Sequence, residues 1–167
     1  MTGVQTCALP ICAVSDFLNP DRIVVGCDDP EAAGKVTDLY RDLRAPTVVT
    51  DPASAEMSKY ASNAFLATKI SFMNAVANLC EAVGADVNEV ALGMGCDPRI
   101  GFEFLQPGPG YGGSCFPKDT AALIHTAAEH GYDFSLLRGV VEVNREQHRR
   151  MVDKLRAAVS LGKHEPP

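Results

Sequence analysis

The stretch DPASAEMSKYASNAFLATKISFMNAVANLCEAVG, residues 51–84, decides how the rest of the chain is interpreted. Asp51-Pro52 opens it and Gly84 ends it. Apolar residues recur at helical spacing in between, which predicts one helix over 53–83 with a length of roughly 46 Å. These apolar residues cover more than one narrow stripe, so we expect the helix to be buried by neighbours or by a partner subunit.

The residues before this helix are typical of a small α/β unit. RIVVG (22–26) and PTVVT (46–50) predict strands, and the residues from 28 to 43 predict a helix that Asp29 caps. Such a unit is too small for a whole domain, so 13–52 is interpreted as the end of a larger Rossmann-like sheet. Residues 1–12 lack any period, and we expect them to be a non-native leader.

The residues after the long helix predict further helices around one loop. A helix begins near Asp86, a Gly/Pro-rich loop covers 101–117, and helices follow at about 118–130 and 135–157, the last one capped by Ser135. Residues 158–167 are interpreted as a frayed tail. The predicted fold is therefore mainly α: the end of an α/β sheet, then an all-helical central domain over 53–157.

Composition excludes several classes of protein. The formal net charge of −6 disfavours a nucleic-acid binder, and the 46% of apolar residues favours a packed core. No apolar run is long enough to span a membrane. The six cysteines show no C-x-x-C pair and no metal-ligand spacing with the histidines, so we expect reduced thiols, a cytoplasmic protein and no metal site.

The loop GPGYGGSCFPKD, residues 108–119, can carry chemistry. Its glycines leave backbone N–H groups accessible to a ligand, and Cys115 is a candidate nucleophile. Lys118 can favour the thiolate, and Asp119 can position a water. The alternative interpretation is a plain turn with a cysteine of the core.

Three more polar residues are candidates. Lys59 and Asn63 lie four apart on the long helix and share a face that can hold an anionic oxygen or a water. The alternative is a solvated stripe. Arg99, just before the loop, can reach phosphate or sugar oxygens, although an isolated arginine is more often a surface residue.

Together these segments resemble the UDP-glucose 6-dehydrogenase family of nucleotide-sugar dehydrogenases. The resemblance runs from about Phe17 to Leu155 and rests on SAEMSKYASNAFLATKISFMNAVANLCEAVGAD, DPRIGFEFL and, most specifically, GPGYGGSCFPKD.

The resemblance implies two NAD-dependent hydride transfers that convert UDP-glucose into UDP-glucuronate through a thiohemiacetal and a thioester on Cys115. Lys59 and Asn63 would stabilise the oxyanion, and Asp119 would place the water. The long helix would form a homodimer. The substrate pocket would be lined by the loop, with Arg99 reaching the partner's site: Arg99, Phe104, Gly110, Tyr111, Gly112, Gly113 and Lys118.

Departures from the family pattern limit what the chain is expected to do. The G-x-G-x-x-G motif of an NAD-binding domain is absent, and Ala75 stands where the family often has Glu. We therefore expect NAD to be bound mainly outside this chain, with Lys118 as a possible contact, and the isolated chain to be inactive. Two alternatives stay open: a stand-alone thiol hydrolase or acyl transferase, and a non-catalytic helical dimerisation module.

Overall fold

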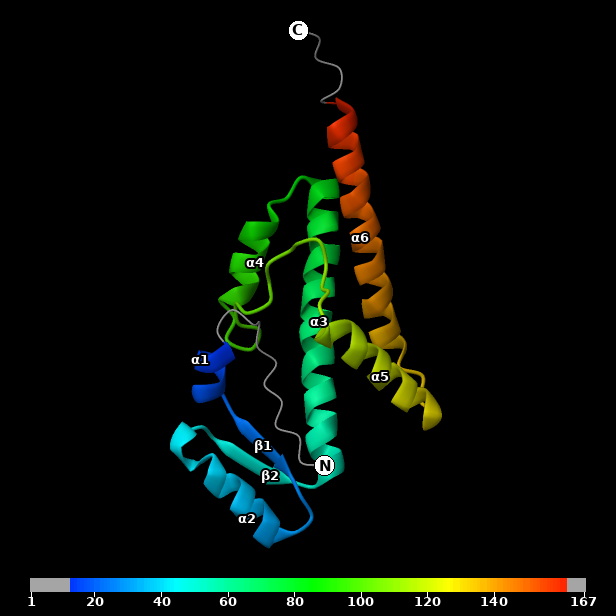
Figure 1. Cartoon of the computed structure of the whole chain (residues 1–167). Coiled ribbons are helices and arrows are strands. Elements are labelled where there is room, and N and C mark those ends of the chain that lie inside the picture. The colour runs from blue at the N-terminus through cyan, green and yellow to red at the C-terminus, as the bar shows by residue number, and fades with distance from the viewer. Residues whose placement is uncertain (1–12, 162–167) are drawn as a thin grey trace. The chain divides into compact units, whose positions relative to one another are not determined.

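The computed structural model describes residues 13–161, so the expectations for 1–12 and for 162–167 lie outside the described residues. Figure 1 shows the elements in chain order. They are α1 (Ala13–Leu18), β1 (Ile23–Gly26), α2 (Pro30–Leu39), the 3-10 turn η2 (Arg41–Leu43), β2 (Thr47–Thr50), α3 (Pro52–Val83), α4 (Val87–Gly95), α5 (Cys115–Glu129) and α6 (Ser135–Leu161). The predicted fold class, mainly helical after a short α/β part, is confirmed.

The chain forms two compact units, one ending at Ala61 and the other starting at Ser62, so their boundary falls inside α3. The division into domains at 52 and 53 stays a prediction. In the first unit, β1 and β2 pair in parallel, with Ile23 opposite Thr47. Ile23 and Val25 of β1 form a small core with Ala33 of α2. Asp29 caps α2 as predicted, because its Oδ1 accepts the Glu31 N–H at 2.9 Å.

The second unit is organised by α3 and α6, which run side by side in the same direction (Figure 1). Ser71 Oγ donates to the Val140 carbonyl, Asn78 Nδ2 donates to Gln147 Oε1, and Arg150 pairs with Glu81. In all three pairs the residues are 69 apart in the sequence. Because this offset is constant, the two helices are parallel and in a fixed register from Ser71 to Glu81.

Several predicted helix limits were wrong, although the helices themselves are present. The helix expected over 28–43 is α2, which ends at Leu39 and tightens into the 3-10 turn η2. The last helix continues to Leu161, so residues 158–161 are helical rather than part of a tail, and Ser135 is its first residue rather than its cap. The short helix α1 was not predicted.

The largest correction concerns the loop. Helix α5 begins at Cys115, three residues earlier than the expected position of 118. Pro117 suggested a loop, yet it lies in the first turn of α5, where a backbone N–H would have no partner inside the helix. The thiol therefore belongs to the first turn of a helix and not to the predicted loop.

Candidate active site

Cys115 is the first residue of α5, and its side chain is partly buried. Its Sγ lies 3.7 Å from the Oγ of Ser114, the residue that precedes the helix. The positive end of a helix favours a negative charge at this position, which suits a nucleophilic thiolate. Among the residues that the structure describes, Cys27, Cys80 and Cys96 are free thiols.

Asp119 lies one turn after Cys115, so the two side chains share a face of α5. The Asp119 side chain is fully buried, and its two oxygens have different partners. Asn63 Nδ2 on α3 donates to Oδ2 at 2.5 Å, and Lys118 Nζ donates to Oδ1 at 2.5 Å. A buried carboxylate needs such donors, because an unpaired buried charge is strongly unfavourable.

Lys59 and Arg99, the other two polar candidates, lie on α3 and just after α4. Lys59 is partly buried on α3, one turn before Asn63, and it belongs to the first compact unit. Arg99 follows α4 and makes an ion pair with Asp97 at 2.6 Å, with 87% of its side chain exposed. The Asp97 carboxylate holds the pKa of Arg99 above its ordinary value, so the guanidinium stays charged at the surface.

The loop between α4 and α5 needs residues that tolerate left-handed backbone. Gly110 and Gly113 have φ of 114° and 76°, and Phe104 has φ of 63° although it carries a side chain. At Gly110 a Cβ would also lie 2.6 Å from Asn144 Oδ1 and 2.7 Å from His148 Nε2. Glycine at 110 is therefore required twice, for its conformation and for the close approach of α6.

A pocket of about 510 Å³ lies beside this loop. It is lined by Ile70 of α3 and by loop residues, namely Phe102, Glu103, Phe104, Gln106, Gly108 and Gly110. Of the residues expected to line a substrate pocket, Phe104 and Gly110 do so. Its aromatic and backbone lining suits a ligand with a flat ring and several hydrogen-bonding groups.

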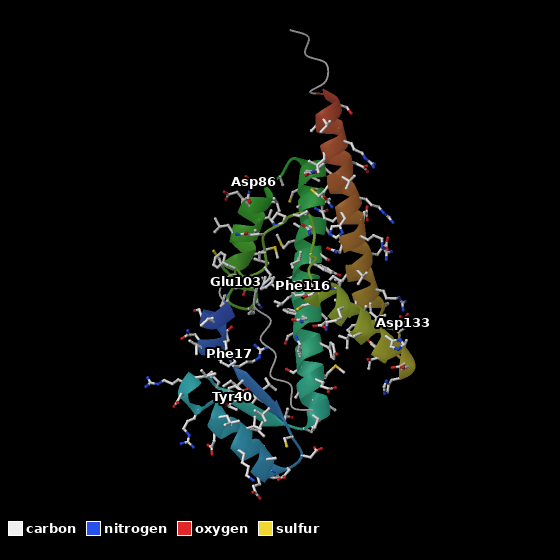
Figure 2. The ribbon with its side chains drawn as sticks, in the orientation of Figure 1. Phe17, Tyr40, Asp86, Glu103, Phe116 and Asp133 are labelled. Atoms are coloured by element: carbon white, nitrogen blue, oxygen red, sulfur yellow. The ribbon has the colours of Figure 1, made fainter. Side chains whose placement is uncertain are left out.

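Three aromatic rings connect the pocket to the thiol. The Phe116 ring meets Phe104 edge-on at 6.5 Å and Tyr111 at 5.9 Å between ring centroids. Figure 2 labels Phe116 at the beginning of α5, next to Cys115 in the sequence. Tyr111 is only 5% exposed, and burial raises the pKa of its phenol, an effect that a hydrogen bond with Thr120 partly offsets.

Sequence reasoning missed the residues that hold the loop from behind. Asn74 of α3 bonds to Gly108, and Asn144 and Gln147 of α6 bond to Tyr111 and Gly108. All three side chains are buried. The sequence does show amide side chains among the apolar residues of these helices, which could have indicated buried polar contacts. It does not reveal what these amides contact.

No group of three or more acidic, histidine or cysteine side chains able to hold a metal occurs within residues 13–161. Among the same residues, no helix is both long and apolar enough to cross a membrane. The site is thus a thiol, a buried carboxylate and a lysine, with a partly aromatic pocket nearby. That combination is suited to covalent catalysis by a thiol.

Comparisons with known proteins identify the family of the chain. Residues 53–146 match the model of the UDP-glucose/GDP-mannose dehydrogenase family, central domain. UDP-glucose 6-dehydrogenase YwqF of Bacillus subtilis (strain 168) is 54% identical over 142 residues, which is 85% of this chain and 32% of that protein. The protein from Rhizobium meliloti (strain 1021), also called UDP-glucose 6-dehydrogenase, is 51% identical over 151 residues, covering 87% of this chain and 35% of its own length.

Solved structures give the same result. A UDP-glucose dehydrogenase from Pyrobaculum islandicum superposes with a TM-score of 0.85 at 42% identity, over 89% of this chain and 34% of that one. A UDP-D-ManNAc dehydrogenase from Pyrococcus horikoshii gives a TM-score of 0.83 at 25% identity, over 99% and 38%. The fold is thus shared by dehydrogenases named for different sugars.

Fold and family match together define the central domain of a dehydrogenase family. The chain belongs to the UDP-glucose/GDP-mannose dehydrogenase family, and residues 53–146 are its central domain. It spans about a third of the length of the curated relatives that it matches.

Proposed function

We propose that this chain is the thiol-bearing part of an enzyme that oxidises UDP-glucose to UDP-glucuronate. The observation that carries the proposal is the position of Cys115 at the first residue of α5, one turn before a buried carboxylate held by Asn63 and Lys118. The relatives named UDP-glucose 6-dehydrogenase support this choice of reaction.

The described residues do not fit NAD. Among the described residues, a strand leads through glycine into a helix only between β1 and α2. This connection has a single glycine, Gly26 at the end of β1, and Cys27, Asp28 and Asp29 follow it. Asp29 already accepts the Glu31 N–H at the beginning of α2, so carboxylates stand where a pyrophosphate would need backbone donors. NAD, the hydride acceptor of the overall reaction, is therefore assigned to parts of the protein beyond these residues.

The residues of this chain account for the covalent steps on either side of oxidation. The Cys115 thiolate attacks the carbonyl carbon of the aldehyde, a C–S bond forms, and the carbonyl π electrons move to oxygen. Lys59 and Asn63 are proposed to stabilise that oxyanion. The nitrogen of the Asn63 amide carries two hydrogens, so its bond to Asp119 does not by itself exclude this role.

Hydrolysis follows once the adduct has reached the thioester level. Water attacks the thioester carbonyl, the C–S bond breaks, and the thiolate leaves as the carboxylate forms. Asp119 is proposed to orient this water and accept its proton, since it lies on the same face of α5 as Cys115. A reducing compartment such as the cytoplasm would keep the thiol available between turnovers.

The pocket beside the loop is proposed to bind the nucleotide sugar. Phe104 and Gly110 line it, and Tyr111, Gly112, Gly113 and Lys118 continue from it to the thiol. The exposed Arg99 is proposed to reach the phosphate or sugar oxygens in the site of a partner subunit.

The partner is proposed to be a second copy docked along α3. Phe65, Phe72 and Leu79 are 65%, 55% and 62% exposed and recur every seven residues, the spacing of a seam between two helices. A row of large exposed apolar side chains along one helix favours self-association. Family membership disfavours the alternative of a stand-alone thiol hydrolase.

The test uses a chimera in which residues 13–161 replace the matching segment of the Bacillus subtilis relative YwqF. We expect the chimera to produce NADH from UDP-glucose, and we expect Cys115→Ser to stall it before the carboxylate is formed. Cys96→Ser, which removes an exposed thiol at the end of α4, is the matched control and should remain active. Steady NADH production at the parental rate by Cys115→Ser would refute the assignment.

A further inference from the structure

We propose that three buried amides, those of Asn74, Asn144 and Gln147, are positioning residues that hold the loop 108–111 and thereby orient Cys115. We call them the amide clamp. The proposal rests on the proposed function, in which Cys115 is the reacting thiol.

Asn144 makes the most complete contact. Its Oδ1 accepts the Tyr111 N–H at 2.7 Å, and its Nδ2 donates to the Tyr111 carbonyl at 3.0 Å. One side chain of α6 therefore satisfies both backbone groups of a single loop residue, as a neighbouring β-strand would. These two hydrogen bonds fix the position and the orientation of the Tyr111 backbone relative to α6.

Gly108 is held in the same way by two side chains from two helices. Its N–H donates to Asn74 Oδ1 at 2.8 Å, and its carbonyl accepts from Gln147 Nε2 at 2.7 Å. Gln147 is itself oriented by Asn78, which donates to its Oε1 at 2.9 Å. Both ends of the loop 108–111 are thus tied to the parallel pair α3 and α6.

An asparagine at position 74 is not the side chain that would be most favourable for core packing alone. The residue is fully buried, and its Nδ2 has no hydrogen-bond partner within the described part of the chain. An unsatisfied buried donor is unfavourable, and an apolar side chain of similar size would avoid it. The one thing that Asn74 provides and Leu would not is the acceptor for Gly108.

The loop passes this constraint on to the thiol over a short distance. Only three residues separate Tyr111 from Cys115, and the Tyr111 ring contacts the ring of Phe116, the next residue in α5. The clamp therefore fixes the segment on one side of Cys115, and helix α5 fixes it on the other. Loss of the clamp should leave α5 formed but allow its first turn to move.

The test is the pH profile of Cys115 alkylation by iodoacetamide in the chain 1–167, followed by peptide mass spectrometry. Asn144→Leu removes both bonds to Tyr111, and Gln147→Met removes the bond to the Gly108 carbonyl. Ser71→Ala is the matched control, because Ser71 is equally buried and bonds α3 to α6 without touching the loop. Cys96, an exposed thiol in the same chain, is the internal reference.

In both clamp variants, we expect the Cys115 alkylation rate at neutral pH to change by at least about fivefold, the effect of one lost hydrogen bond. Exchange of the Tyr111 amide should rise at least about tenfold in Asn144→Leu. Ser71→Ala and the Cys96 profile should match the parent. These measurements do not depend on catalytic turnover. The clamp can therefore be refuted here independently of the proposed function, which is tested by NADH production in the Cys115→Ser chimera.

Two outcomes would overturn the proposal. The first is a Cys115 profile in folded Asn144→Leu and Gln147→Met that coincides with the parental one. The second is that both variants unfold at a urea concentration at which Ser71→Ala remains folded, which would mean that the amides serve only to stabilise the fold. If Asn144→Leu alone fails to fold, Gln147→Met decides.

Discussion

Asn63 Nδ2 lies 2.5 Å from Asp119 Oδ2, and both side chains are buried although 56 residues separate them in the sequence. This hydrogen bond joins α3 to the first turns of α5. Asp119 is the carboxylate nearest to Cys115 in the sequence of α5, and its position therefore depends on α3. Stability and catalysis are therefore expected to depend on the same contact.

The first prediction concerns this pair. Asn63→Leu leaves the buried Asp119 with one donor fewer, so we expect a loss of about 1.5–3 kcal/mol in the free energy of unfolding. Urea denaturation followed by circular dichroism measures it. The double variant Asn63→Leu/Asp119→Leu should recover part of the loss, because no buried charge remains. An unchanged urea midpoint for Asn63→Leu would contradict the assignment of this bond.

The second prediction separates the exposed side of α3 from its buried side. Phe65 is 65% exposed, whereas Met73 is fully buried. Phe65→Asp should abolish association and keep the fold, because the charge remains in water. Met73→Asp should unfold the chain, because it buries an unpaired charge.

Light scattering across a dilution series measures the association, and circular dichroism measures the fold. A parental chain that stays a monomer at tens of micromolar, the range where interfaces of moderate affinity form, would refute the proposed dimer. Equal association by Phe65→Asp and the parent would show that the contact lies elsewhere.

A third prediction concerns the cofactor. Because the β1–α2 turn presents carboxylates instead of free backbone donors, calorimetry should detect no NAD binding by the chain at about millimolar concentration, the weak end of ordinary affinities. The chimera with YwqF is the comparison, and we expect it to bind. Binding in the micromolar range by the chain alone would mean that it contains an NAD site we have not identified.

A fourth prediction follows from Tyr111. Burial raises the pKa of its phenol, so above pH of about 10 the unfolded chain releases a proton that the folded chain keeps. The stability associated with this phenol is complete below the unfolded pKa and is lost as the pH rises through the folded pKa. Tyr111→Phe should therefore flatten the fall of stability in the alkaline range.

Urea midpoints measured between neutral pH and about pH 11 test this effect. Tyr132→Phe is the control, since Tyr132 is 61% exposed, and it should retain the parental slope. The same slope in Tyr111→Phe as in the parent would show that other groups cause the alkaline loss.

Much of the local structure could be predicted from the sequence because it depends on nearby residues. Asp29 caps α2, Gly84 adopts the left-handed backbone expected where a helix ends, and the long helix spans Pro52–Val83. The spacing of Cys115, Lys118 and Asp119 likewise predicted a charged cluster around one thiol. Pro117 misled the prediction, since proline is acceptable in a loop and in the first turn of a helix alike.

The sequence by itself determined where helices form, the order of the elements, and the residues that resemble a nucleotide-sugar dehydrogenase. Only the tertiary structure decided that Asn63 is the partner of Asp119, that Asn144 and Gln147 hold the loop, and that Phe65 faces outward while Met73 is buried. The physical reason is that α3 is apolar on several sides. Helical periodicity therefore cannot select its inner face, which is chosen by the parallel packing of α6 with its constant offset of 69 residues.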